Sequence, residues 1–150
     1  MAKALVVYDS VYGNTEKIAK SLAAGLESGG VDVGVVKVDA VKFDELREVD
    51  LLCVGSPVQA WSASKPVKEF LERLKSVDGL RGKKAFAFDT KMKSRLAGDA
   101  AGKIERKLKD LGFTIAKPSE SAIVKGREGP LEESAEVTFK QTGAELAKKM

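Results

Sequence analysis

The chain has 150 residues, of which 43% are hydrophobic and 32% charged, and this size and composition predict one compact domain over residues 1–150. It contains no histidine, which excludes imidazole catalysis and histidine-ligated metal, and we expect no metal site. The only cysteine, Cys53, excludes an intrachain disulfide and lies in an apolar run, so we expect a buried thiol. With no apolar stretch near the roughly 18 residues of a membrane span and no secretory signal, we predict a cytoplasmic protein without a membrane partner.

Positive charge is concentrated in the second half of the chain. The formal net charge is +4, and residues 81–109 alone hold 10 basic and 3 acidic residues. Such a segment can attract acidic partners or anionic ligands, or it can be the solvated face of a helix carrying Lys103, Arg106, Lys107 and Lys109. No aromatic residue interleaves with these helical charges, so nucleic acid is not an expected partner.

Strand and helix patterns alternate along the whole chain. Continuous apolar runs are typical of parallel strands buried on both faces, whereas apolar residues spaced three and four apart indicate helices. A weak helical piece is expected at Phe43–Val49. The expected strands are Lys3–Tyr8, Val31–Val38 at an edge, Asp50–Gly55, Lys83–Asp89, and a final strand, Phe113–Ala116 and Ser121–Val124, interrupted at 117–119. The expected helices cover residues 15–28, a segment from Pro66 to Val77, a segment from about Gly98 to Leu111, and a last segment that opens at Pro130. This alternation predicts an open parallel sheet with helices on both faces.

The loop between the first strand and the first helix is the strongest functional signal. It combines hydroxyl and amide groups with the N-terminus of a helix, where unpaired N–H groups and the helix dipole favour a phosphate. The spacing matches neither the dinucleotide fingerprint nor a P-loop. An ordinary strand–helix connection with a good N-cap is the structural alternative. The loop reads Ser10-Val11-Tyr12-Gly13-Asn14-Thr15.

This motif resembles the phosphate loop of the flavodoxin family, Thr/Ser-x-Thr-Gly-x-Thr, with Tyr12 in place of the middle threonine. Related quinone reductases and A-type flavoproteins tolerate an aromatic residue there, so the resemblance leaves the subfamily open. It implies a flavodoxin-like three-layer α/β/α fold with a five-stranded parallel sheet in the order 2-1-3-4-5. It also implies an FMN whose phosphate is bound by residues 10–15, with the flavin beside the loops that follow the third and fourth strands.

Those two loops complete the expected FMN site. After the third strand, the Gly-Ser-Pro segment resembles the flavodoxin loop that borders the flavin ring, and its candidates are Ser56, Pro57, Val58, Gln59 and Trp61. Trp61 either stacks on the ring or packs over the following helix. After the fourth strand, the candidates are Asp89, Thr90 and Met92, with Leu96 as a second residue able to cover the ring. This loop departs from the family, because it has no aromatic residue where flavodoxins place a tyrosine over the flavin, and Lys91, Lys93 and Arg95 replace the acids.

The sequence therefore predicts an FMN-binding electron-transfer flavoprotein that shuttles electrons between redox protein partners, a reductase and an acceptor, as a monomer or weak dimer. No catalytic residue is expected, because the protein mainly tunes and exposes the cofactor. The alternative is a small FMN-dependent NAD(P)H/quinone-type reductase. A flavodoxin-like interaction domain that has lost FMN remains open. A phosphoacceptor receiver domain is disfavoured, since Gly55-Ser56 stands where it needs an aspartate.

Overall fold

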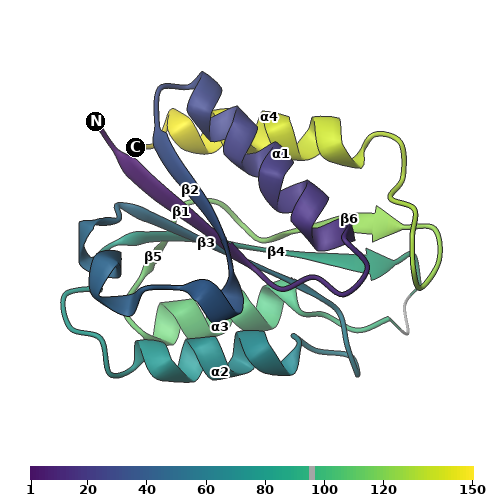
Figure 1. Ribbon diagram of the computed structural model, residues 1–150, viewed down its shortest axis with the longest axis horizontal. Helices are drawn as coiled ribbons and strands as arrows, with labels where there is room; N and C mark the ends of the chain where they lie inside the picture. The colour runs from purple at the N-terminus through teal and green to yellow at the C-terminus, as the bar shows by residue number, and fades with distance from the viewer. Residues whose placement is uncertain (95–96) are drawn as a thin grey trace.

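The computed structural model describes residues 1–94 and 97–150. One parallel sheet lies between two layers of helices, and its strands follow the order β2-β1-β3-β4-β5, so the predicted fold and strand order are confirmed (Figure 1). The strands are β1 (Lys3–Tyr8), β2 (Asp32–Lys37), β3 (Leu51–Pro57), β4 (Lys84–Met92), β5 (Thr114–Ile115) and β6 (Glu120–Val124). The helices are α1 (Asn14–Ser28), α2 (Lys65–Leu74), α3 (Ala101–Asp110) and α4 (Ala135–Ala147), with short 3₁₀ segments at Val38–Ala40 and Phe43–Glu48.

The last strand of the sheet is divided into β5 and β6, as the sequence predicts. Both pieces pair in parallel with β4: β5 opposite Lys84 and Ala85, and β6 opposite residues 88–92. Because the two pieces run in the same direction, the carboxyl end of β6 reaches the same edge of the sheet as the carboxyl ends of β3 and β4.

Several element boundaries differ from those expected, and three of the differences follow from strand pairing. β3 continues to Pro57 and β4 to Met92, because Pro57 pairs with Thr90 and Met92 pairs with Val124 of β6. The last helix begins at Ala135 rather than at Pro130. The residues after Pro130 pair with β6 instead: Leu131 bridges Val124, and the Glu132 amide donates to the Ile123 carbonyl.

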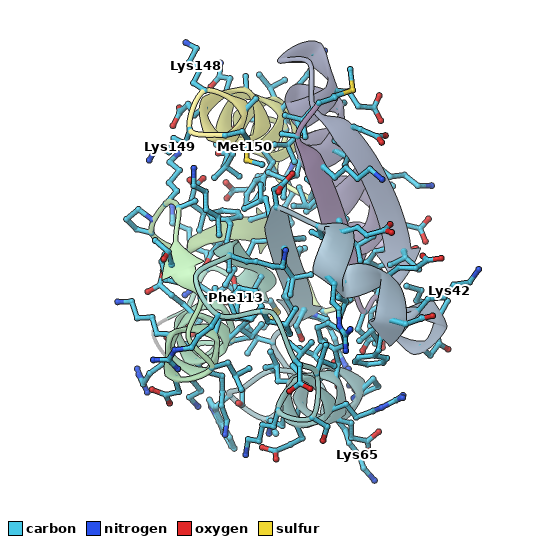
Figure 2. The ribbon with its side chains drawn as sticks, turned by 90° about the vertical axis from the view of Figure 1, so that its left-hand side faces the viewer. Lys42, Lys65, Phe113, Lys148, Lys149 and Met150 are labelled. Carbon is cyan, nitrogen blue, oxygen red and sulfur yellow. The ribbon has the colours of Figure 1, made fainter. Side chains whose placement is uncertain are left out.

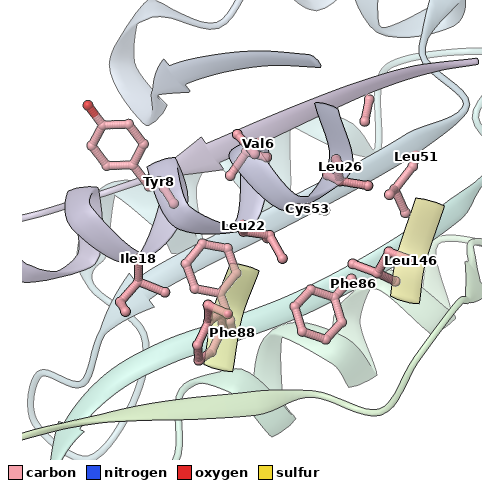
Figure 3. Close-up of a cluster of buried hydrophobic side chains, with 14 of the residues drawn as sticks. Val6, Tyr8, Ile18, Leu22, Leu26, Leu51, Cys53, Phe86, Phe88 and Leu146 are labelled. Atoms are coloured by element: carbon pink, nitrogen blue, oxygen red, sulfur yellow. The ribbon is translucent and has the colours of Figure 1, made fainter. Parts of the chain in front are cut away.

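A separate apolar core fills the space on each side of the sheet. α1 and α4 cover one face and α2 and α3 the other, and Figure 2 shows the two layers from the side that bears Lys148, Lys149 and Met150. Figure 3 shows the core beneath α1 and α4, where Ile18 and Leu22 meet Phe86 and Phe88. Cys53 lies fully buried in this core, as predicted, and burial raises the pKa of its thiol far above the ordinary value. Among the described residues, no helix is both long and apolar enough to cross a bilayer.

α1 and α4 cross in close contact through two glycines. A β-carbon placed on Gly25 would lie 2.0 Å from the Lys140 carbonyl oxygen, and one on Gly143 would lie 2.2 Å from the Leu22 carbonyl oxygen. Neither backbone leaves room for a methyl group, so any larger residue must push the helices apart. This crossing fixes α1, and with it the N-terminal turn that faces the carboxyl edge of the sheet.

Candidate functional site

A cleft of ≈ 450 Å³ lies at the carboxyl edge of the sheet. It lies where the loops after β1, β3, β4 and β6 come together, which is the usual place for a ligand in an open parallel sheet. Its volume is within the roughly 300–1,000 Å³ range of small-molecule sites. The described residues that line it are Ser10, Val11, Tyr12, Asn14, Thr15, Pro57, Val58, Gln59, Ala60, Thr90, Lys91, Met92, Ala97, Val124 and Arg127.

The first wall of the cleft is the turn that starts α1. Gly13 adopts a φ of 90°, a left-handed conformation that glycine takes without steric cost, and its amide donates to Ser10 Oγ at 3.0 Å. The N-terminus of α1 has no side-chain cap among the described residues, so it lacks the good N-cap that an ordinary strand–helix connection would have. Uncapped amides at the positive end of the helix dipole suit a bound anion.

Thr15 joins this turn to the end of β4. Its side chain is only 1% exposed, and its hydroxyl lies 2.7 Å from the Thr90 hydroxyl. Two hydroxyl groups bring two hydrogens, of which their mutual bond uses one. The pair therefore keeps one donor for a further acceptor at the cleft.

The second wall is a tight turn over residues 59–62. Gln59 and Ser62 exchange backbone hydrogen bonds of 2.8 and 3.0 Å, while Ala60 and Trp61 have φ values of 47° and 65°. Positive φ at both central residues is the pattern of a type I′ turn, which favours glycine and asparagine. Holding Ala60 and Trp61 at positive φ costs of order 1–3 kcal/mol each, so the surroundings must stabilise the turn.

Those surroundings belong to the segment before α3 and to α3 itself. The Trp61 carbonyl accepts a hydrogen bond from the Asp99 amide at 3.2 Å and another from Lys103 Nζ at 3.0 Å. A β-carbon on Gly98 would lie 2.3 Å from the Trp61 α-carbon. The Trp61 backbone is therefore held against the loop that follows β4, the third loop of the site. Its side chain, 65% exposed, stands at the surface beside the cleft.

A fourth loop, after β6, closes the cleft on the side of α1. Asn14 Nδ2 donates to the Glu128 carbonyl at 3.1 Å, and Arg127 from the same loop lines the cleft. With Lys91 from β4, Arg127 gives the cleft two cationic side chains, and no carboxylate lines it among the described residues. This composition makes the cleft favourable for an anionic ligand.

The family-model and structural comparisons agree with this geometry. A family model described as Flavodoxin matches residues 6–141. The chain belongs to the flavodoxin family. A solved flavodoxin from the domain Archaea superposes with a TM-score of 0.84 at 30% identity, covering 98% of this chain and 97% of that one.

Two curated relatives match over shorter stretches. A flavodoxin of Aquifex aeolicus is 37% identical over 73 residues, which cover 48% of this chain and 40% of the relative. An NAD(P)H dehydrogenase (quinone) of Archaeoglobus fulgidus is 28% identical over 97 residues, which cover 48% of this chain and 51% of the relative. The matched region thus spans about half or less of each relative. Flavodoxins bind FMN, so membership of the family confirms the expected cofactor.

Ten of the fourteen site residues expected from the sequence line the cleft. The four that do not line it are Gly13, Ser56, Trp61 and Asp89. Gly13 provides the left-handed turn. Ser56 is fully buried, and its hydroxyl accepts from the Ser64 amide at 2.9 Å and donates to the Pro57 carbonyl at 2.8 Å, so it shapes the second loop from behind.

Asp89 faces the helix layer instead of the cleft. Its side chain is fully buried, and Oδ2 accepts from the amides of Ala100 and Ala101 at 3.2 and 2.9 Å, at the start of α3. Burial raises the pKa of Asp89, while hydrogen bonds from the Ser121 side chain and these two amides oppose the rise. Asp89 therefore anchors α3 beneath the third loop.

The structure describes the third loop, which follows β4, except for residues 95 and 96. Thr90 and Met92 line the cleft, and Met92 is 44% exposed. The expectations for Arg95 and Leu96 lie outside the described residues. The sequence interpretation missed Ala60, Lys91, Ala97, Val124 and Arg127 as lining residues. The signal for Arg127 was available: a basic residue soon after the last strand of a parallel sheet lies at the edge where ligands bind.

Proposed function

We propose that the chain is a flavodoxin-type electron carrier that binds FMN in the cleft and passes electrons between redox proteins. The observation that carries the proposal is the convergence of the loops after β1, β3 and β4 on one cleft at the carboxyl edge of the sheet. When bound, FMN accepts and releases electrons, and the protein supplies binding, orientation and electrostatics.

The residues present fit FMN. The phosphate would be held by the amides at the start of α1, by Ser10 and by the Thr15–Thr90 pair, all of which offer donors. The second loop and Met92 would flank the flavin ring, with Tyr12 and Trp61 as exposed aromatic groups near its edge. Lys91 and Arg127 would favour negative charge on the cofactor.

The cleft chemistry supports a carrier. Among the described lining residues, the ionisable side chains are Tyr12, Lys91 and Arg127, so no carboxylate, thiol or imidazole is placed to move a proton for a substrate. An electron carrier needs no such group. A small NAD(P)H/quinone-type reductase is the second candidate, which the cationic side chains and the similarity to a quinone dehydrogenase favour.

Reconstitution and turnover test both candidates. Protein mixed with FMN and freed of excess flavin should absorb near 450 nm, roughly where oxidised flavins absorb, in about a 1:1 ratio. Without flavin absorbance after reconstitution, the proposal fails. NAD(P)H and a quinone should then give no turnover until a separate reductase is added, whereas turnover without it selects the second candidate.

A further inference from the structure

A second hollow, of ≈ 370 Å³, lies between α2 and α3. Ser62 and Ala63 form one end of it, so it begins where the 59–62 turn leaves the FMN cleft. The turn is therefore a ridge with the cleft on one side and this helix groove on the other. The name "helix groove" is used below for this hollow.

Basic side chains dominate the helix groove. Lys68 from α2 and Lys103, Arg106 and Lys107 from α3 line it, together with two acids, Glu72 and Asp110. Glu72 is already paired, at 2.8 Å with Lys75 Nζ and at 3.4 Å with Lys107 Nζ. Hydrogen bonds from these two lysines lower the pKa of Glu72. The groove thus carries a net positive charge, and Lys91 and Arg127 extend this charge into the cleft.

Exposed apolar side chains lie at the cleft and on the ridge that separates it from the helix groove. Of the seven large hydrophobic residues that are exposed in the described chain, four lie at the cleft or on the ridge: Val11, Tyr12, Trp61 and Met92. Exposed apolar groups gathered at one place mark an interaction surface. An apolar centre with charged surroundings is the usual arrangement of a protein–protein interface.

Lys103 connects the helix groove to the ridge. Lys103 lines the groove, and its ammonium group donates to the Trp61 carbonyl at 3.0 Å. The charged groove and the apolar ridge are therefore parts of one continuous surface. This surface borders the FMN cleft. A partner seated on this surface would lie close to the cofactor.

We propose that the helix groove and the ridge form the docking surface for a small redox protein with an acidic face; this rests on the proposed function. Complementary charge speeds the encounter of such partners and fixes their orientation. A protein is favoured over a nicotinamide dinucleotide because the apolar residues protrude, Trp61 being 65% exposed, whereas a small-molecule site encloses most of its ligand. Each one-electron partner gives up one electron, so two partner molecules and protons from water complete the two-electron reduction of FMN.

Binding measured at several salt concentrations tests the docking surface. The protein is first loaded with FMN, and its dissociation constant is then measured by calorimetry with an acidic [2Fe–2S] ferredoxin and with basic cytochrome c. The ferredoxin should bind at low salt and weaken about tenfold or more as the Debye length falls from about 30 Å to below about 10 Å. Cytochrome c should bind weakly or not at all at low salt.

Two double variants that change the net charge by the same amount distinguish an effect on the docking surface from an effect of overall charge. Lys68→Glu with Arg106→Glu changes the helix groove, whereas Lys140→Glu with Lys148→Glu changes α4 and its C-terminal end, in the opposite helix layer (Figure 2). The groove pair should weaken ferredoxin binding at least about tenfold, and the α4 pair about threefold or less, in line with the value of charges in direct contact. Both pairs should keep the same flavin absorbance.

Three results would overturn the docking proposal: equal effects of the two pairs, preference for cytochrome c, or binding of NADP⁺ to the groove cations with no binding of ferredoxin. Failure of the proposed function looks different. In that case FMN does not bind, and the two pairs are compared for ferredoxin binding in the flavin-free protein, where a larger effect of the groove pair still supports the docking surface and equal effects still overturn it.

Discussion

The hydroxyl oxygens of Thr15 and Thr90 lie 2.7 Å apart, and both side chains are buried at the base of the cleft. The contact joins the first turn of α1 to the end of β4, 75 residues further along the chain. It thereby ties the loop expected to hold the phosphate to the third loop. One hydroxyl hydrogen of the pair remains for another acceptor.

Replacing Thr15 by valine should weaken FMN binding much more than riboflavin binding. Valine keeps the volume but removes a hydroxyl that is expected to serve the phosphate. A hydrogen bond to a charged group contributes roughly 1.5–3 kcal/mol, so we expect the FMN dissociation constant to rise by about tenfold or more. Fluorescence titration with the two flavins measures both constants.

Thr142→Val is the matched control for this change. Thr142 is also a buried threonine, but its hydroxyl lies 2.8 Å from Glu120 Oε1 and 3.1 Å from the Thr138 carbonyl, and its one hydrogen serves these acceptors away from the cleft. The control should reduce stability without changing the ratio of the two flavin affinities. Equal losses of FMN and riboflavin binding in Thr15→Val would show that Thr15 does not serve the phosphate.

The repeating pattern of the chain made the fold predictable. Lys3–Tyr8 has the expected boundaries, and α1 begins one residue before the expected helix. β2, which alternates apolar and polar residues, lies at the expected edge of the sheet. In these segments the sequence pattern and the tertiary packing favour the same structure, and local reasoning then suffices.

Residues whose role depends on distant pairing were not predictable. In the sequence, Asp89 stands at the end of an apolar run, which is the position of a ligand-binding residue. In the structure the strand continues to Met92, and the Asp89 carboxylate lies under α3. Arg127 reaches the cleft only because β6 pairs with the far end of β4. The left-handed Ala60 and Trp61 have no local sequence signal, since neither is a residue that favours positive φ.

Removing the indole of Trp61 should raise the fluorescence of bound FMN if the side chain covers the flavin. Trp61→Ala removes the aromatic face, whereas Trp61→Tyr keeps an electron-rich ring that can stack on the flavin and should retain most of the quenching. Val137→Ala, on α4 at a similar exposure of 61%, is the control for a change of exposed apolar surface. Fluorescence that is the same in Trp61→Ala and in the parent protein would show that the exposed indole does not cover the flavin.

Replacing Gly98, in the loop after β4, by alanine should displace the loop after β3, which contains Trp61. The new β-carbon would lie 2.3 Å from the Trp61 α-carbon, and Gly98 has a φ of 89°. Overpacking costs about 1–3 kcal/mol and adds to the cost of positive φ. We expect lower stability in urea unfolding, together with weaker FMN binding, because the ridge moves.

Gly82→Ala isolates the backbone contribution to the Gly98 effect. Gly82 has a φ of 87°, but a β-carbon there would meet no atom within 4 Å. Its substitution should cost only the strain of positive φ and leave FMN affinity unchanged. If the two variants lose the same stability and the same flavin affinity, the contact between Gly98 and Trp61 does not support the cleft.

Replacing Asp89 by asparagine should change how stability depends on pH. Burial raises the pKa of Asp89, so the folded protein holds this proton more tightly than the unfolded chain, in which the pKa is about 3.9. The parent protein therefore loses the stability that this group contributes as the pH rises from about 4 through the raised pKa. The asparagine side chain carries no charge and still offers an oxygen to the amides of Ala100 and Ala101. The variant should gain stability relative to the parent across this window, with a constant difference above it, and urea unfolding from pH 4 to about 8 measures the difference. A difference that does not change with pH would show that Asp89 has the same pKa in the folded and unfolded states.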